Sequence, residues 1–109
     1  MEFMTDNHVE SVLAQLECII QERLSAGDSS SYVHRLVASG TDRILQKIGE
    51  EATEFVIAGK NKAVAEICEE GADLIFHLLV FLQSQGLALS DITQVLAQRA
   101  AQTDSENAS

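Results

Sequence analysis

Acidic side chains that could bind a hard cation gather in two neighbouring stretches of this 109-residue chain. The first stretch holds Glu50, Glu51 and Glu54, and the second holds Glu66, Glu69, Glu70 and Asp73. Both stretches carry apolar residues at three- and four-residue intervals, which is typical of amphipathic helices. Like charges that share one helical face repel one another unless something compensates them. Mg²⁺ prefers oxygen ligands and can bridge carboxylates to phosphate oxygens, so the pattern is compatible with a magnesium site.

Two basic residues, Arg43 and Lys47, precede the first acidic stretch on the same side of the expected helix. Their side chains would suit the phosphate groups of a ligand held beside the cation. The alternative is that both acidic stretches are solvated helix faces with incidental ion pairs to Lys47 and Lys60. The spacing alone leaves both interpretations open.

Five helical segments are expected to position these residues in an all-α domain that spans residues 1–109. Proline is absent and glycine is sparse, which favours helices over a fold that needs many turns. The segments cover about 5–26, 31–38, 41–60, 61–85 and the residues from 90 onward. The expected N-caps are Thr5 or Asp6, Thr41, Asn61 and Ser90. We expect an ordered core over 5–102 and a flexible tail over 103–109.

The segment 61–85 is the most apolar part of the chain. Between positions 74 and 82 its only polar residue is His77. A helix that is apolar on all sides must be covered on all sides, and four other helices can hardly cover it alone. The sequence therefore predicts a compact bundle that assembles as a homodimer through this helix. A short turn at Asn61 predicts an antiparallel hairpin with the preceding helix, which would bring the two acidic stretches together.

Charge and cysteine content narrow the class of protein. The net charge of −10 would be repelled by nucleic acid or by an anionic membrane, so neither is expected as a partner. Cys18 and Cys68 are far apart and form neither a zinc pattern nor a redox motif. Reduced thiols and the lack of a visible secretory signal predict a cytoplasmic protein.

Four motifs together carry a family resemblance. They are Ser31-Tyr32-(x)₃-Leu36-(x)₃-Gly40, Ile44-x-x-Lys47-x-Gly49-Glu50-Glu51-x-x-Glu54, Glu70-x-x-Asp73-Leu74-Ile75-Phe76-His77-Leu78-Leu79-Val80 and Val95-Leu96-x-x-Arg99. The acids resemble the EExxE…ExxD pattern of the all-α, MazG-like nucleoside-triphosphate pyrophosphohydrolases. The flanking residues resemble the phosphoribosyl-ATP pyrophosphatase family over nearly the whole chain. One departure is Phe76, where the family more often has tyrosine.

The resemblance implies a dimeric, Mg²⁺-dependent hydrolase of histidine biosynthesis. The implied reaction cleaves phosphoribosyl-ATP between its α and β phosphates to phosphoribosyl-AMP and pyrophosphate. The implied metal ligands are Glu50, Glu51, Glu54, Glu70 and Asp73. Either Glu50 or Glu51 would activate the attacking water. Related chains often carry the next enzyme of the pathway, and this one is expected to be the standalone form.

Five further residues could complete the site. We expect Lys47, with Arg43, to hold phosphate oxygens. Tyr32 and Arg35 could contact the ribosyl phosphate or the purine, or could be ordinary residues of a helix surface. His77 is either a partner of the Asp73 carboxylate that orients it or a satisfied histidine in the dimer interface.

Three other functions compete with this hypothesis. A MazG-like hydrolase would act on ordinary nucleoside triphosphates instead. A helical di-iron protein would need Glu-x-x-His pairs, which neither Glu50 nor Glu70 supplies. A non-catalytic acidic module that binds a basic partner would spread its carboxylates into solvent and would need no divalent ion.

Overall fold

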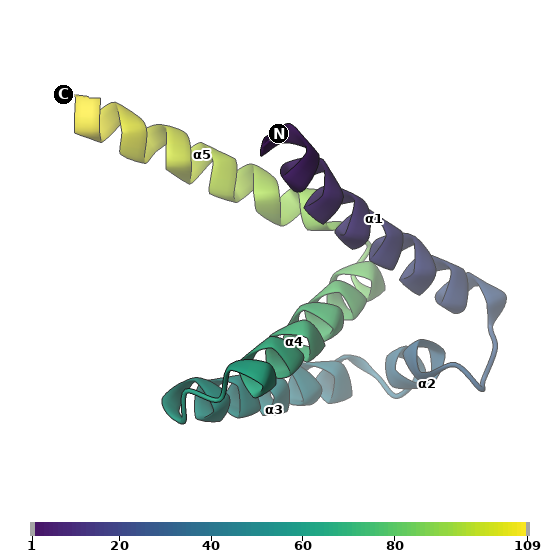
Figure 1. Ribbon diagram of the computed structural model, residues 1–109. Helices are drawn as coiled ribbons and strands as arrows, with labels where there is room; N and C mark the ends of the chain where they lie inside the picture. The colour runs from purple at the N-terminus through teal and green to yellow at the C-terminus, as the bar shows by residue number, and fades with distance from the viewer. Residues whose placement is uncertain (1, 109) are drawn as a thin grey trace.

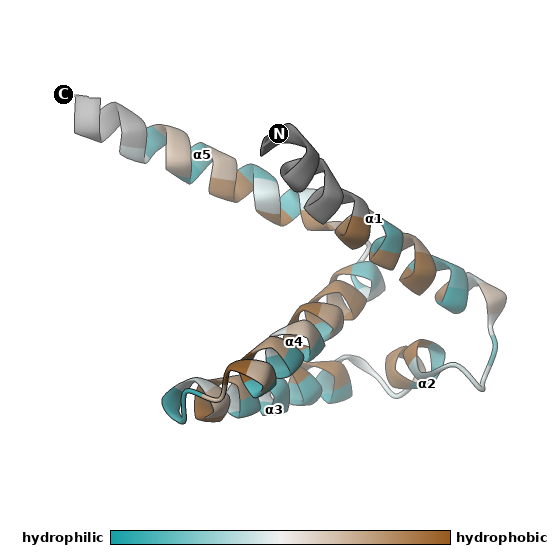
Figure 2. Cartoon of the chain, viewed as in Figure 1, coloured by the Kyte–Doolittle hydropathy of each residue, from teal (hydrophilic) through white to brown (hydrophobic). Residues whose placement is uncertain are grey.

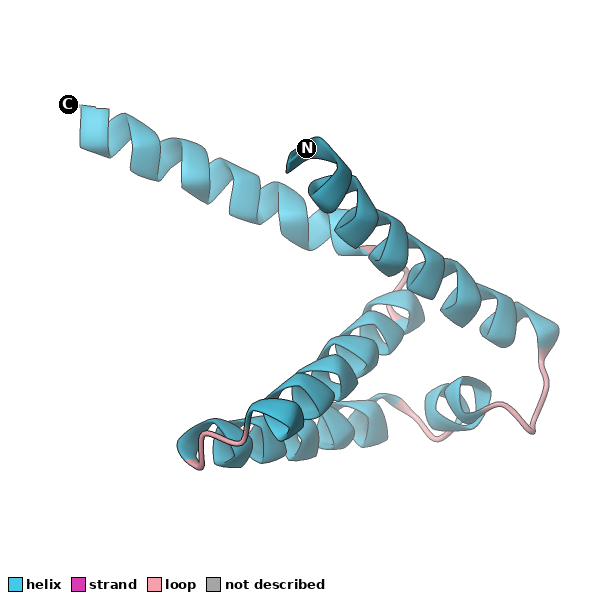
Figure 3. Cartoon of the chain, viewed as in Figure 1, coloured by secondary structure: helices cyan, strands magenta, loops and turns pink. Residues whose placement is uncertain are grey.

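The chain folds into helices throughout, as its patterning predicts. The computed structural model describes the backbone of residues 2–108 and the side chains of residues 12–103. No strand occurs within that described backbone (Figures 1 and 3). The helices are α1 (Glu2–Ala26), α2 (Tyr32–Ala38), α3 (Thr41–Lys60), α4 (Val64–Ser84) and α5 (Leu89–Ala108). The predicted all-α class with five helices is confirmed.

Helix starts differ from the expected N-caps Thr5 or Asp6, Thr41, Asn61 and Ser90. Helix α1 begins at Glu2 and α5 at Leu89, while Gly40 precedes α3 and Ala63 precedes α4. At α5 a different side chain satisfies the free backbone donor, because the Asp91 carboxylate accepts a 2.8 Å hydrogen bond from the N–H of Ala88. Helix α5 also continues to Ala108, past the expected end of the ordered core at residue 102.

The turn between α3 and α4 explains why Asn61 ends one helix instead of starting the next. Two backbone bonds close α3, from Lys62 N–H to the Gly59 carbonyl at 3.1 Å and from Ala63 N–H to the Ala58 carbonyl at 3.2 Å. This pair of bonds is the Schellman arrangement, which requires a left-handed residue after the helix. Lys62 takes that conformation with φ 57°, although it is not a glycine.

Replacing Lys62 by glycine should therefore stabilise the protein by about 1 kcal/mol, the cost of a left-handed conformation at a residue with a Cβ atom. Gly86 is the matched control, because it has φ 73° and ends α4 with the equivalent bond from Leu87 N–H to the Leu82 carbonyl. Gly86→Ala should lower stability by a similar amount. Urea denaturation of both variants measures the two shifts, and a loss of stability in Lys62→Gly would contradict this account.

Helices α3 and α4 form the predicted antiparallel hairpin and lie side by side (Figure 1). A glycine allows their close approach, because a Cβ atom built at Gly71 would lie 3.3 Å from the ring of Phe55. The hairpin places the acidic stretches of the two helices opposite each other. The turn between α3 and α4 closes one end of the hairpin. It thereby sets which residues of α3 lie opposite which residues of α4.

The core forms where α1, α2 and α3 meet the C-terminal half of α4. Its buried apolar residues are Ile20, Val33, Leu36, Ile44, Leu79, Val80 and Leu82. Two apolar side chains in the second half of α3 are left uncovered by the other described residues. Phe55 is 37% exposed and Val56 is 66% exposed. The core of one chain is therefore small.

A single chain is open, in contrast to the compact bundle that the sequence predicts. Its radius of gyration is 16.4 Å, whereas a compact domain of this length has about 13 Å. Helix α5 projects away from the α3–α4 hairpin (Figure 1), and hydrophobic and hydrophilic residues alternate along the part of it that is coloured by hydropathy (Figure 2). Ile92, Val95 and Leu96 of α5 are exposed, as are Ile75 and Leu78 of α4.

Helix α5 is attached to the rest of the chain at its first turn. The Glu17 carboxylate of α1 accepts a 2.8 Å hydrogen bond from the N–H of Leu89. An apolar cavity of about 220 Å³ lies at the junction of α1, α4 and α5. Within the described residues, no single helix has the length and apolar character to cross a membrane. The pair Val64–Ser84 and Leu89–Thr103 meets those two criteria only when taken together, and it is bent by 108°.

Candidate active site

Three carboxylates from the two helices of the hairpin converge on one point. Glu51 of α3 and Glu70 and Asp73 of α4 each place an oxygen within 4.8 Å of the others. Glu51 is buried, Glu70 is partly buried and Asp73 is exposed, so the group lies at the edge of the core and opens to solvent. The helical spacing alone left open whether these acids meet, and the hairpin brings them together.

Glu54 extends this cluster through Glu70. A hydrogen bond from the protonated Glu70 carboxyl group to the Glu54 carboxylate raises the pKa of Glu70 to about 6, and burial and the charges of Glu54, Asp73 and Glu51 add to the effect. Two carboxyl groups can share a hydrogen bond only when one of them holds a proton. The Glu70 Oε2 atom is also buried without a hydrogen-bond partner among the described residues. A hard divalent cation prefers oxygen ligands. It would therefore suit a group of repelling carboxylates in which one buried oxygen has no partner.

The stability of the metal-free protein should fall as the pH rises through the pKa of Glu70. That pKa is about 6 in the folded chain and 4.5 for an ordinary glutamate, so the folded state binds the extra proton between these values. Ionisation of Glu70 above pH 6 therefore favours unfolding, and the penalty is absent below pH 4.5. Urea midpoints at pH 5 and pH 7 measure the loss, which should shrink in Glu70→Gln and on addition of Mg²⁺. An equal loss in Glu70→Gln would contradict this assignment.

Glu50 stands apart from this cluster. Its side chain is exposed, and it is not among the residues that approach within 4.8 Å of a common point. Its charge instead acts on Lys47. Neighbouring residues on a helix point about 100° apart, so Glu50 and Glu51 cannot both face α4. The geometry supports Glu51, Glu70 and Asp73 as metal ligands and gives Glu50 no such support.

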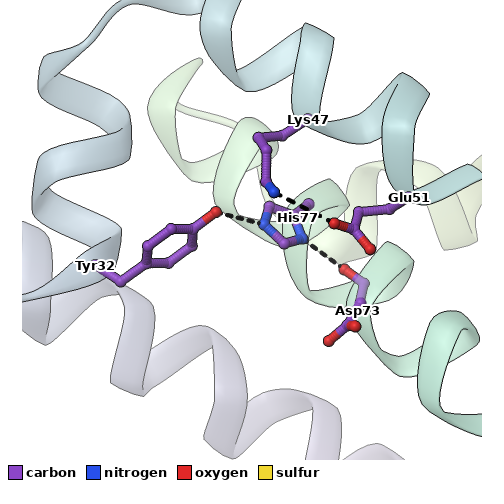
Figure 4. A network of polar contacts seen from close by, with 5 residues as sticks. All are labelled: Tyr32, Lys47, Glu51, Asp73 and His77. Atoms are coloured by element: carbon purple, nitrogen blue, oxygen red, sulfur yellow. Dashed lines mark hydrogen bonds and ion pairs between the residues drawn. The ribbon is translucent and has the colours of Figure 1, made fainter.

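Lys47 lies between the acidic cluster and a pocket. Its Nζ atom is 3.4 Å from Glu51 Oε1 (Figure 4). Partial burial acts to lower the pKa of Lys47, but Tyr32, Glu51 and Glu50 outweigh it, so the pKa is raised. Lys47 therefore stays protonated at neutral pH.

The four residues predicted to bind substrate all line this pocket, which has a volume of about 320 Å³. Its lining residues are Tyr32, Arg35, Leu36, Ser39, Arg43 and Lys47. Lys47 thus connects a pocket lined by three cationic side chains to the acidic cluster. Leu36 and Ser39 are lining residues that the sequence reasoning missed. Ser39 lies one helical turn after Arg35, and this spacing is the signal that could have found it.

Arg35 also stabilises the loop before α2. Its Nη1 atom donates hydrogen bonds to the Ser30 carbonyl at 2.6 Å and to the Ser29 carbonyl at 3.2 Å. One end of the guanidinium group is thus already engaged, and the remaining donors are available to the pocket.

His77 does not contact the Asp73 carboxylate, which was one of its two predicted roles. Both of its ring nitrogens are engaged, as the other role predicts, and its place in a dimer interface stays a prediction. Its Nδ1 atom lies 2.7 Å from the main-chain carbonyl of Asp73, not from the carboxylate, and its Nε2 atom lies 2.8 Å from the Tyr32 hydroxyl. Figure 4 shows these contacts joining α2 to α4. The rings of Tyr32 and Phe76 stack nearby with centroids 6.3 Å apart. No sequence pattern signals the bond between Tyr32 and His77, because the two residues are 45 positions apart and on different helices.

Comparison with known proteins gives this geometry its context. Residues 13–100 match the family described as phosphoribosyl-ATP pyrophosphohydrolase. The chain belongs to this family. The match includes every residue of the acidic cluster and of the cationic pocket. The predicted family and its hydrolase class are therefore confirmed.

Members of the phosphoribosyl-ATP pyrophosphohydrolase family differ in length. The chain is 49% identical over 87 residues to a histidine biosynthesis bifunctional protein HisIE of Photobacterium profundum, and this covers 80% of the chain and 42% of that relative. A HisIE protein of Vibrio vulnificus shows the same identity with 41% of its length covered. A phosphoribosyl-ATP pyrophosphatase of Pyrobaculum aerophilum is 41% identical over 88 residues, which cover 94% of that protein. The chain thus spans about two fifths of the bifunctional relatives and nearly all of the Pyrobaculum relative.

Proposed function

We propose that this chain hydrolyses phosphoribosyl-ATP between its α and β phosphates, releasing phosphoribosyl-AMP and pyrophosphate, in a Mg²⁺-dependent step of histidine biosynthesis. One observation carries the proposal: a cluster of three carboxylates lies directly beside a pocket lined by Arg35, Arg43 and Lys47. Dispersed acids would suit a solvated surface, whereas acids and cations that share one site suit a metal-bound polyphosphate. The names of the relatives support the proposal, since one is a phosphoribosyl-ATP pyrophosphatase and another a histidine biosynthesis protein.

The residues that would hold Mg²⁺ are Glu51, Glu70 and Asp73. Glu54 lies beside them and shares a hydrogen bond with Glu70. When bound, Mg²⁺ offsets the negative charge of the phosphate oxygens and of the pyrophosphate that leaves. The unpaired Glu70 Oε2 atom fits this role, because a cation would satisfy it. Release of the proton shared by Glu54 and Glu70 would accompany binding of the ion.

Phosphate binding and proton transfer are carried out by side chains of the pocket and of its border with the acidic cluster. Lys47, held protonated beside Glu51, binds a phosphate oxygen at the border, and Arg43 binds another across the pocket. A carboxylate accepts a proton from water as the water oxygen attacks phosphorus and the bridging P–O bond breaks. Glu51 is paired with Lys47 and belongs to the proposed metal cluster, whereas Glu50 is exposed and lies outside that cluster. We therefore favour Glu50 for this proton transfer, with Glu51 as the alternative.

Comparison of substrates tests the proposed reaction. Purified protein with Mg²⁺ should release pyrophosphate from phosphoribosyl-ATP at least tenfold faster, in kcat/KM, than from dUTP or dCTP, since only the first carries the second ribosyl phosphate. Omission of Mg²⁺ should abolish the release. Faster turnover of dUTP or dCTP would assign the chain to the MazG-like house-cleaning hydrolases, and no turnover at all would favour a binding module.

A homodimer and a cytoplasmic location complete the proposal. The open shape of one chain and the exposed apolar residues of α4 and α5 support a second copy as the cover for both helices. The two free cysteines suit a reducing compartment.

The dimer predicts a measurable mass. Light scattering should give twice the mass of one chain, and Leu78→Glu should shift the protein toward monomer because a charge replaces an exposed apolar side chain of α4. Glu69→Ala, at an exposed acid of the same helix, should leave the dimer intact. A monomeric wild-type protein would contradict the proposed assembly.

A further inference from the structure

His77 is buried, and both of its ring nitrogens are engaged. The side of the ring at Nδ1 faces the main-chain carbonyl of Asp73, which can only accept a hydrogen bond. Nδ1 must therefore carry the hydrogen, and Nε2 of the neutral ring has only a lone pair. The group at Nε2 is the Tyr32 hydroxyl, 2.8 Å away, which must then be the donor. The backbone of α4 thus fixes the direction in which the Tyr32 hydrogen points.

Packing holds this arrangement in place. The ring of His77 meets the rings of Tyr32 and Phe76 edge to face, with centroids 5.8 Å and 5.2 Å away. His77 is only 6% exposed, so water does not compete for its nitrogens. Tyr32 keeps 40% of its surface exposed and forms a wall of the cationic pocket. Its ring is therefore held rigidly from one side and faces solvent on the other.

Tyr32 lines the pocket, and its oxygen has no hydrogen left to donate there. A phenol has one hydrogen, and His77 takes it, so only lone pairs remain. A phosphate oxygen is itself an acceptor and cannot pair with such an oxygen. A sugar hydroxyl group can donate to it, and so can the Lys47 ammonium group, which also lines the pocket.

We propose that His77 is a positioning residue that makes Tyr32 an acceptor only, so that Tyr32 recognises a ribose hydroxyl of the substrate and not a phosphate. The inference deepens the proposed hydrolysis of phosphoribosyl-ATP and rests on it. The sequence left Tyr32 a contact to the ribosyl phosphate, a contact to the purine or no role in binding, and the inference replaces these with a contact to the sugar itself. Arg35, Arg43 and Lys47 are left to bind the phosphates.

Analogues of phosphoribosyl-ATP that each lack one ribose hydroxyl test this assignment. In the wild-type enzyme one analogue should lose roughly tenfold in kcat/KM, the factor for one hydrogen bond that an enzyme group makes to its substrate. In Tyr32→Phe the same analogue and the parent compound should react equally. His77→Leu should also lose the discrimination, whereas His77→Gln, whose amide oxygen can accept from Tyr32, should retain part of it. Phe76→Leu, which removes a packing contact but no hydrogen bond, should retain more of it than His77→Leu.

Discrimination that persists in Tyr32→Phe, or its absence in the wild-type enzyme, would overturn the inference. The ¹⁵N spectrum of His77 supplies a readout that needs no turnover. It should show a protonated Nδ1 and an unprotonated Nε2, with the Nε2 signal shifting in Tyr32→Phe. A protonated Nε2 would refute the arrangement whatever the enzyme hydrolyses, and a correct tautomer without hydrolysis would point to failure of the proposed function alone.

Discussion

Asp73→Asn should lower the rate of phosphoribosyl-ATP hydrolysis by a factor on the order of 10³, with a similar loss in Glu51→Gln. Each change keeps the shape of the side chain but removes a negative charge from the cluster that would hold Mg²⁺. Asp73 and Glu51 lie on different helices, so matching losses would show that α3 and α4 serve one site. Initial rates of pyrophosphate release at saturating Mg²⁺ measure the effect.

Glu69→Gln is the matched control for these variants. Glu69 is an exposed acid next to Glu70, and it lies outside the three-residue cluster. Its replacement should leave the rate within a factor of about two, since surface charges distant from the reacting groups contribute little. Without Mg²⁺, Asp73→Asn should also be at least as stable as the wild-type chain, because it relieves repulsion and breaks no ion pair seen among the described residues. A folded Asp73→Asn enzyme with full activity would contradict the proposed site.

Lys47→Gln should lower kcat/KM by about 100-fold, the second largest effect expected. Lys47 serves two groups, because it pairs with Glu51 at 3.4 Å and also lines the pocket. Its loss would leave Glu51 without its cation and the phosphate without one donor. The effect should fall on both kcat and KM, since the Lys47 charge would contact phosphate before and during bond cleavage.

Lys60→Gln provides the control for Lys47, because Lys60 is an exposed lysine at the far end of α3. Steady-state kinetics with phosphoribosyl-ATP should show no more than a twofold change for it. Equal effects of the two substitutions would mean that Lys47 acts only through net charge, and the assigned phosphate contact would then be wrong.

Helical periodicity predicted the existence and order of the helices because the relevant interactions are local. The apolar stripe that contains Ile44 and Ile48 predicted the buried face of α3, and the short turn at Asn61 predicted the hairpin. The helix boundaries were less predictable. The left-handed residue that follows a helix is usually glycine, whereas after α3 it is Lys62. The exposure of Phe55 and Val56 could not be read from a single chain, because a helix pattern does not say which molecule covers it.

The candidate site shows the same division between local and distant contacts. The acids and cations were predictable because charge at three- and four-residue spacing marks one helical face, and the hairpin then pairs the faces. The separation of Glu50 from Glu51 depends on the rotation of α3 against α4, which adjacent acids in a sequence do not reveal. The bond between Tyr32 and His77 depends on how α2 packs on α4, and no local rule sets that packing.

The most direct test of a shared cation site is a calorimetric titration of Mg²⁺ into the substrate-free protein. The account predicts saturable binding to the wild-type chain and to Glu69→Gln. It predicts that binding is lost both in Glu51→Gln, changed on α3, and in Asp73→Asn, changed on α4. Undiminished Mg²⁺ binding in either of these two variants would show that the helices do not hold one ion between them, and the central claim would fail.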